Sequence, residues 1–361
     1  MSVQTDRINK LRGVLESNSQ AAVISDENNV YYFSGVQNSE GRMLVTRDEA
    51  YLLVDFRYSE TARKNCNACK VIEFKSLYED IKSIFKKHGI DTVLIEADAI
   101  CLSAYTRMVR EFNSVGVSIV SDETLSRKIS NLRIVKSEDE IACIAEAQRI
   151  TEKAYNEVLN YIKPGVCERK IAIELEYLMK KFGAQGVSFD LITITGAKTS
   201  LPHGVPSDGV IAEGDFFTMD IGSLYKGYHS DMTRTVAVKS YSEKQEQIYN
   251  IVLNAQLTAL NSVKAGVKAF DVDKTARDII TDAGYGKNFG HSTGHGVGLN
   301  IHEHPYVNTK GDKLLSENMV ITVEPGIYLE GEFGVRIEDM VLVTNEGYKN
   351  FATLSKELIV V

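Results

Sequence analysis

Short apolar runs alternate with amphipathic stretches over the first ~130 residues of the chain. The runs are rich in valine and isoleucine and cover residues 21–25, 51–56, 70–74, 91–97 and 117–121. Runs of this length and composition are typical of strands, whereas residues 77–88 have the apolar spacing of a helix that covers a sheet. The alternation predicts an α/β domain.

A polar and charged segment, residues 126–140, separates this region from the rest of the chain. It leads into a long helical pattern from about Glu138 to Ile162, which begins with a Ser-Glu-Asp-Glu start signal. We therefore place a domain boundary near residue 130, which gives one domain over 1–130 and a second over 131–361.

The second domain contains a weak internal repeat. Lys-Pro-Gly-Val at 163–166 and Lys-Ala-Gly-Val at 264–267 each precede a helical pattern, and these patterns stop at Gly183 and Gly284. A long helix precedes each unit and strand-like sequence follows it. Two such halves are expected to pack their sheets together around a crevice.

Composition narrows the possible functions. The 361 residues are 43% hydrophobic and 25% charged, which is ordinary for a globular protein with a sizeable core. A net charge of −8 without a basic block argues against a nucleic-acid or anionic-membrane surface. No run reaches the ~18 apolar residues of a spanning helix, and the polar N-terminus does not resemble a signal peptide. We expect a soluble cytoplasmic protein.

The five cysteines are scattered and odd in number, so they do not form a disulfide framework. Cys66 and Cys69 make a C-x-x-C pair, but no second pair completes a zinc site. We assign them no role.

Histidine is concentrated in one glycine-rich stretch. Four of the seven histidines lie between His291 and His304, interleaved with Gly294, Gly296 and Gly298. The glycines disfavour a helix, and in an extended chain His291 and His295 are ~13 Å apart. One of them could bind a metal ion while the others line the same pocket, so the other ligands must come from elsewhere.

Four carboxylates lie in or at the ends of apolar strand-like segments: Asp220, Asp231, Glu324 and Glu338. Each half of the repeat contributes two of them. Burying four carboxylates is costly unless a positive charge neutralises them, and two divalent cations would do so. A set of four carboxylates and one imidazole suits manganese, cobalt or iron. The alternative for each acid is an exposed position or an ion pair with an arginine.

Six motifs occur in an order that resembles the Xaa-Pro peptidases (prolidase and aminopeptidase P) of the pita-bread metallopeptidase family. They are LPHG (201–204), MDIG (219–222), SDMTRT (230–235), HSTGHGVGLNIHE (291–303), TVEPGIY (322–328) and GVRIED (334–339). The resemblance covers nearly the whole chain. Residues 1–130 resemble a creatinase-type N-terminal α/β domain, and 131–361 resemble the pseudo-two-fold pita-bread catalytic domain.

The resemblance implies five ligands for two divalent metal ions, of which manganese is the expected kind, with cobalt, iron or zinc possible. Asp220 would hold one ion, His295 and Glu324 the other, and Asp231 and Glu338 would bridge them. Glu324 would also carry the proton from water to the leaving nitrogen. The remaining implied residues bind substrate and stabilise the transition state: His203, His291, His302 and, for binding alone, Arg336.

The implied activity is hydrolysis of the Xaa-Pro bond at the N-terminus of dipeptides or short peptides. The resemblance also implies a homodimer. Methionine aminopeptidase is the nearest alternative, and the HGVP sequence at 203–206 favours it. A metal-free creatinase-like enzyme and a non-catalytic binding module are further alternatives, but all five ligand positions retain acids or histidine. Asp55 and Arg57 are candidates for distinguishing dipeptides from longer peptides, with a structural ion pair as the alternative. His229 matches no ligand position.

Overall fold

The computed structural model describes residues 2–37 and 39–361, which divide into two compact units. The first ends at Arg133 and the second is Ile134–Val361. None of the helices in the described residues is both long enough and apolar enough to cross a membrane.

The first unit is built on a six-stranded mixed sheet with the order β4-β3-β2-β1-β5-β6. Its apolar core lies between this sheet and helices such as α4 and α5. The strands are β1 (Gln20–Ile24), β2 (Arg42–Thr46), β3 (Ala50–Val54), β4 (Lys70–Glu73), β5 (Thr92–Ile95) and β6 (Ser118–Val120). The helices are α1 (Val3–Arg12), α2 (Glu27–Ser34), α3 (Phe56–Asn65), α4 (Leu77–His88), α5 (Leu102–Asn113) and α6 (Thr124–Arg133).

All five apolar runs of the sequence analysis coincide with strands of this sheet, and α4 has the predicted bounds 77–88. Strand β2 was not predicted. Its apolar run is only Met43–Val45, and it pairs with β3 in an antiparallel hairpin closed at Thr46 and Glu49. The α/β class predicted for this part of the chain is confirmed.

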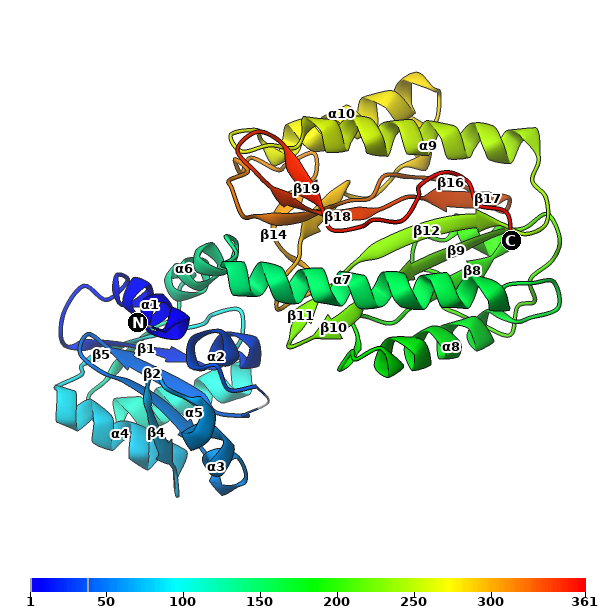
Figure 1. Ribbon diagram of the computed structural model, residues 1–361. Helices are drawn as coiled ribbons and strands as arrows, with labels where there is room; N and C mark the ends of the chain where they lie inside the picture. Colours follow the sequence, from blue (N-terminus) through cyan, green and yellow to red (C-terminus); the bar gives the residue numbers. More distant parts are fainter. Residues whose placement is uncertain (1, 38) are drawn as a thin grey trace. The chain divides into compact units, whose positions relative to one another are not determined.

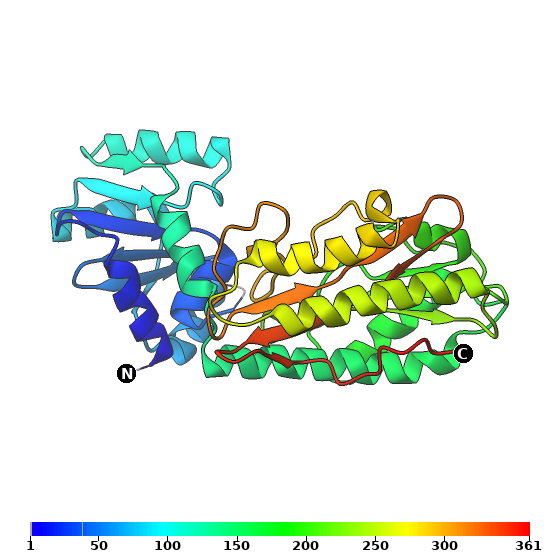
Figure 2. The ribbon, with the colours of Figure 1, turned by 90° about the horizontal axis from the view of Figure 1, so that it is seen from above.

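The second unit contains two long helix pairs with strands between them (Figure 1). Helices α7 (Glu138–Val158) and α8 (Glu168–Lys181) cover one side, and α9 (Glu243–Ser262) and α10 (Ala269–Asp282) cover the other. Figure 2 shows α9 and α10 running next to each other over the strands. Short 3-10 helices occupy Leu159–Tyr161, Gly196–Ser200 and Gly286–Asn288.

The strands of the second unit form several small sheets. The first half supplies β7 (Gly186–Val187), β8 (Ile192–Thr195), β9 (Phe216–Ile221), β10 (Ser223–Tyr225), β11 (Tyr228–His229) and β12 (Met232–Ala237). The second half supplies β13 (Gly294–Gly296), β14 (Glu303–Val307), β15 (Val320–Val323), β16 (Gly326–Leu329), β17 (Phe333–Arg336), β18 (Asp339–Val343) and β19 (Tyr348–Asn350). The orders β12-β9-β8 and β14-β13-β15-β18-β19 describe the two sheets that matter for the site.

The internal repeat is visible in the backbone. Gly165 and Gly183 flank α8, Gly266 and Gly284 flank α10, and all four have φ between 86° and 108°. A side chain at such φ values is strained, which explains why glycine recurs at equivalent turns of both halves. Each repeat thus has a long helix, a turn and a helix of 14 residues, α8 or α10.

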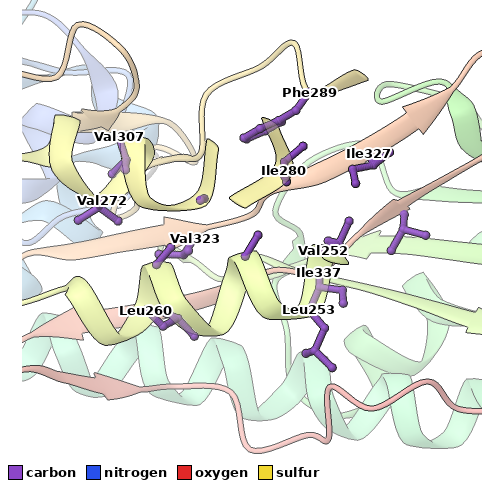
Figure 3. Packing of buried hydrophobic residues seen from close by; sticks show 14 of the residues in the cluster. Val252, Leu253, Leu260, Val272, Ile280, Phe289, Val307, Val323, Ile327 and Ile337 are labelled. Atoms are coloured by element: carbon purple, nitrogen blue, oxygen red, sulfur yellow. The ribbon is translucent and has the colours of Figure 1, made fainter. Parts of the chain in front are cut away.

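Each half has its own apolar core. In the first half, α7 and α8 pack on β9 and β12. In the second, α9 and α10 pack on strands β15 to β18 and the connections between them. Figure 3 shows this second cluster, with Val252, Leu253, Leu260, Val272, Ile280, Phe289, Val307, Val323, Ile327 and Ile337 labelled. The two cores hold the strands between them rigidly, which is what a precisely spaced polar site requires.

Candidate metal centre and active site

The strands place the four predicted acids in pairs. Asp220 lies in β9, opposite Thr233 of the antiparallel strand β12, and Asp231 immediately precedes β12. Glu324 directly follows β15, whose Val323 pairs with Asp339 of β18. Glu338 lies between β17 and β18, not inside a strand as predicted, because the chain there leaves the two-stranded β16–β17 sheet and enters the five-stranded one.

One cavity of about 490 Å³ collects all nine residues that the sequence assigned to the site. Its polar lining includes Asp220, Asp231, Glu324, Glu338, His203, His291, His295, His302 and Arg336. His229 is not among the described residues that line it. Asp55 and Arg57 belong to the other unit, where Arg57 forms ion pairs with Asp55 and Glu40.

Three of these residues have potential ligand atoms that lie close enough together to bind one metal ion. Atoms of Asp231, His295 and Glu338 all lie within 4.8 Å of one another. Nε2 of His295 is 3.5 Å from Oδ2 of Asp231 and 3.3 Å from Oε1 of Glu324. Asp220 instead turns one oxygen toward Arg336.

The carboxylates at this point repel one another. Burial, followed by the charges of neighbouring acids, raises the pKa of Asp231 and of Glu338 well above the ordinary values. Glu324 differs because contact with His295 outweighs the effect of burial and lowers its pKa to about 2. Burial and mutual repulsion thus disfavour the charged forms of Asp231 and Glu338, and a divalent cation bound between them would favour those charged forms.

His295 is oriented as a metal ligand would be. Its Nδ1 lies 3.0 Å from the carbonyl oxygen of Gly296, so Nδ1 carries the hydrogen and Nε2 faces the acids. Burial disfavours the imidazolium, but the hydrogen bond to Glu324 and the charge of Asp231 outweigh it and raise the pKa of His295 to about 9.

Asp220 provides a further test of whether cations fit. Its Oδ2 accepts a hydrogen bond of 2.6 Å from Nη2 of Arg336. Its Oδ1 is buried and has no hydrogen-bond partner among the described residues. A buried carboxylate oxygen without a partner is rare and costly, whereas a cation would satisfy it. The donor set and this unsatisfied oxygen therefore fit divalent cations.

Arg336 organises the polar wall of the cavity and is itself only 4% exposed. Its guanidinium also donates to the hydroxyl of Tyr328 at 2.9 Å, to Oγ1 of Thr233 at 3.1 Å and to the carbonyl of Pro202 at 3.2 Å. The role in substrate binding that the sequence indicated for Arg336 stays a prediction, and these four hydrogen bonds point to a second role within the protein. We infer that it holds Asp220 and the cavity wall in place.

Tyr328 is a site residue that sequence reasoning missed, although it closes the TVEPGIY motif. Its hydroxyl accepts from Arg336 and lies 2.9 Å from Nε2 of His291. Nδ1 of His291 faces the carbonyl of Ser292, so it carries the hydrogen and Nε2 accepts the proton of Tyr328. Burial lowers the pKa of His291, which keeps the ring neutral in this arrangement.

The other two histidines are more accessible. The ring of His302 packs edge-on against His295 with 4.4 Å between centroids, and burial followed by the charge of His295 lowers its pKa. His203 lines the cavity from an exposed loop. Both are placed where they can contact a molecule in the cavity.

Gly294 lets β13 approach β15 closely. A Cβ atom at this position would lie 2.0 Å from the carbonyl oxygen of Thr322, which is impossible without moving a strand. Thr322 in turn donates to Glu324 and accepts from the backbone of His295, so that shift would displace two site residues.

We expect Gly294→Ala to lower the free energy of unfolding by about 2 kcal/mol or more through this overlap, and to weaken metal binding. Gly290→Ala is the matched control, because a Cβ there meets nothing within 4 Å. Urea unfolding and titration calorimetry with Mn²⁺ measure the two effects. A Gly294→Ala protein as stable as the Gly290→Ala protein would contradict the prediction.

Comparison with known proteins agrees with this architecture. Residues 142–345 match the model of metallopeptidase family M24, and residues 7–135 match the creatinase/prolidase N-terminal domain. An Xaa-Pro dipeptidase of Pyrococcus horikoshii is 40% identical over 361 residues, covering 99% of this chain and 100% of the relative.

Two solved structures are also similar over almost the whole chain. An Xaa-Pro dipeptidase from Bacillus anthracis has a TM-score of 0.95 at 38% identity, covering 99% of this chain and 100% of its own. An X-Pro aminopeptidase from Thermotoga maritima has a TM-score of 0.90 at 37% identity, with the same coverage. From the paired strands, the acid-lined cavity and these matches it follows that the chain belongs to metallopeptidase family M24 and carries a creatinase/prolidase-type N-terminal domain.

Proposed function

We propose that the protein hydrolyses the Xaa-Pro bond at the N-terminus of dipeptides or short peptides, using two divalent cations. The observation that carries the proposal is the convergence of four carboxylates and His295, from both halves of one unit, on a single cavity. The names of the relatives, Xaa-Pro dipeptidase and X-Pro aminopeptidase, support the choice of bond.

Asp220, Asp231, His295, Glu324 and Glu338 are the residues that would hold the cations, and the oxygen-rich set favours manganese. A pair of such cations supplies a water nucleophile at neutral pH and polarises the scissile carbonyl. The unpartnered Oδ1 of Asp220 and the mutual repulsion at Asp231 and Glu338 support this assignment.

Side chains of the protein would transfer the protons and position the substrate. Glu324, whose pKa is lowered by its contact with His295, would accept a proton from water and deliver it to the leaving nitrogen. His302 and His203 face the cavity and can donate hydrogen bonds to the developing oxyanion. The cavity also has an apolar and aromatic surface that could contact a proline ring or an apolar side chain. It is formed by Phe189, Ile192 and Tyr306.

Assays on Gly-Pro and Ala-Pro test the proposal directly. We expect hydrolysis with added Mn²⁺, no hydrolysis after chelation, and recovery when the metal is restored. Protein that binds Mn²⁺ yet cleaves neither peptide would overturn the assignment of substrate. The dipeptide Gly-Ala, which lacks proline at the second position, is the control for substrate specificity.

Methionine aminopeptidase activity is the second candidate, favoured by the His-Gly-Val-Pro sequence at 203–206. Cleavage of Met-Ala peptides without cleavage of Xaa-Pro peptides would support it. Within the proposed function, comparing Gly-Pro with Gly-Pro-Ala separates a dipeptidase, which requires the free carboxylate next to proline, from an aminopeptidase, which accepts a longer chain.

A further inference from the structure

His203 reaches the cavity from a loop that cannot hold it by packing alone. We define the His203 loop as residues 196–207. His203 is exposed, and its neighbours Leu201 and Val205 are 53% and 73% exposed. A side chain on such a segment samples several positions unless the ends of the segment are fixed.

A single buried carboxylate binds both ends of the His203 loop. Glu168, in the first turn of α8, is 0% exposed. Its Oε1 accepts from the backbone N–H of Thr195 at 2.9 Å, immediately before the loop. Its Oε2 accepts from the backbone N–H of Ser207 at 2.9 Å and from the Ser207 hydroxyl at 2.7 Å, at the loop's other end.

A lysine inside the loop completes this contact. Nζ of Lys198 donates to Oε2 of Glu168 at 2.7 Å and to Oγ of Ser207 at 2.8 Å. Burial disfavours the charge on Glu168, but the hydrogen bonds from Lys198, Ser207 and Thr195 outweigh it and lower its pKa. Glu168 is thus a buried anion whose two carboxylate oxygens accept hydrogen bonds from the His203 loop and the residue before it. Such charge-assisted hydrogen bonds are stronger than those between neutral groups.

The middle of the loop is joined to the cavity wall separately. Thr199 Oγ1 accepts from the backbone N–H of Gly334 at 2.8 Å, and the carbonyl of Pro202 accepts from Arg336. Fixed ends and two fixed points in the middle leave His203 one position over the cavity.

We propose that Glu168 is a positioning residue that acts through His203, by holding the two ends of the His203 loop together. The inference rests on the proposed function, in which His203 contacts the substrate. Because Glu168 does not line the cavity itself, its whole effect on hydrolysis must pass through the loop.

The test is a double-mutant cycle of Glu168→Gln with His203→Ala, assayed on Gly-Pro with Mn²⁺. Gln cannot match the carboxylate, because in either orientation of the amide its NH₂ group faces a donor: the N–H of Thr195, or the donors of Ser207 and Lys198. We expect Glu168→Gln alone to lower kcat about tenfold with KM changed by less than about threefold. In the His203→Ala background we expect it to lower kcat by less than about twofold, because the residue it positions is gone.

Arg169→Gln is the matched control. Arg169 is adjacent to Glu168 and pairs with Asp208 beside the same loop, but the side chains of that pair are 55% and 86% exposed. We expect wild-type kinetics from it. Lys198→Met is a milder variant that leaves the backbone contacts of Glu168 in place. It tests the proposal if Glu168→Gln does not fold. The kcat that it loses should be lost only when His203 is present, and not in the His203→Ala background.

Digestion with subtilisin gives a readout that does not depend on activity. We expect Glu168→Gln to speed cleavage within residues 196–207, mapped by mass spectrometry, with no change for Arg169→Gln. An equal loss of kcat with and without His203, or unchanged cleavage of the loop, would overturn the inference. Wild-type protein that cleaves no Xaa-Pro peptide would instead overturn the proposed function, while the digestion would still report whether Glu168 fixes the loop.

Discussion

Replacing Asp231 by Asn together with Glu338 by Gln is expected to lower kcat/KM for Gly-Pro by at least about a thousandfold, because two of the residues that would hold the cations become neutral amides. The same variant should lose tight binding of Mn²⁺ in titration calorimetry. Asp208→Asn with Glu213→Gln makes the same two kinds of substitution at exposed positions and is the control for net charge.

Most substitutions of buried residues destabilise a protein, but we expect the double variant to be more stable than the wild type when metal is absent. Without metal, burial and mutual repulsion raise the pKa values of Asp231 and Glu338, so the wild-type site opposes folding. Neutral amides of nearly the same shape remove that repulsion. We therefore expect the variant to unfold at higher temperature than wild type in chelator, and only the wild type to gain stability when Mn²⁺ is added. Equal gains in both proteins would place the cations elsewhere.

Removing the guanidinium at position 336 is expected to have the second largest effect. Arg336→Met leaves the carboxylate of Asp220, which is 15% exposed, without its ion pair. Breaking a buried pair by removing one partner costs about 3–5 kcal/mol of unfolding free energy. We also expect kcat to fall, since Tyr328 and Pro202 lose the donor that holds them.

Added Mn²⁺ should reduce the loss of unfolding free energy caused by Arg336→Met, because a cation bound to Asp220 would replace the lost positive charge. Urea unfolding of Arg336→Met, with and without Mn²⁺, measures the difference between the two costs. Arg336→Lys retains the charge but not the forked geometry, so it should lie between wild type and Arg336→Met. A cost that is the same in both conditions would argue that Asp220 does not contact a cation.

Much of the fold could be predicted from sequence because its signals are local. Apolar runs and helical spacing identify β1, β3, β4, β5, β6 and α4 without reference to the rest of the chain. The repeated glycines predicted the two halves because positive φ is a requirement of each turn by itself. Strand β2 was missed because its stability comes from pairing with β1 and β3 on both sides, while its own apolar run is short.

The site was predictable only in part, for a different reason. Acids in apolar sequence indicate a buried polar centre, and all the acids that stood out line one cavity. Their assignment as individual metal ligands remains a prediction. The parts played by Tyr328, Arg336 and Glu168 depend on partners that are distant in sequence, and nothing in their local sequence reveals those partners. Glu168, for example, contacts Ser207 across 39 positions.

The split of the acids between the two halves determines when the site can form during synthesis on the ribosome. Asp220 and Asp231 leave the exit tunnel well before Glu324 and Glu338, and translation of the intervening stretch takes about 5–20 s at ordinary rates of synthesis. During that interval the nascent chain has only half of the carboxylates and cannot retain an ion strongly. With the ligands proposed above, cations would therefore bind only after the residues of both halves have been synthesised.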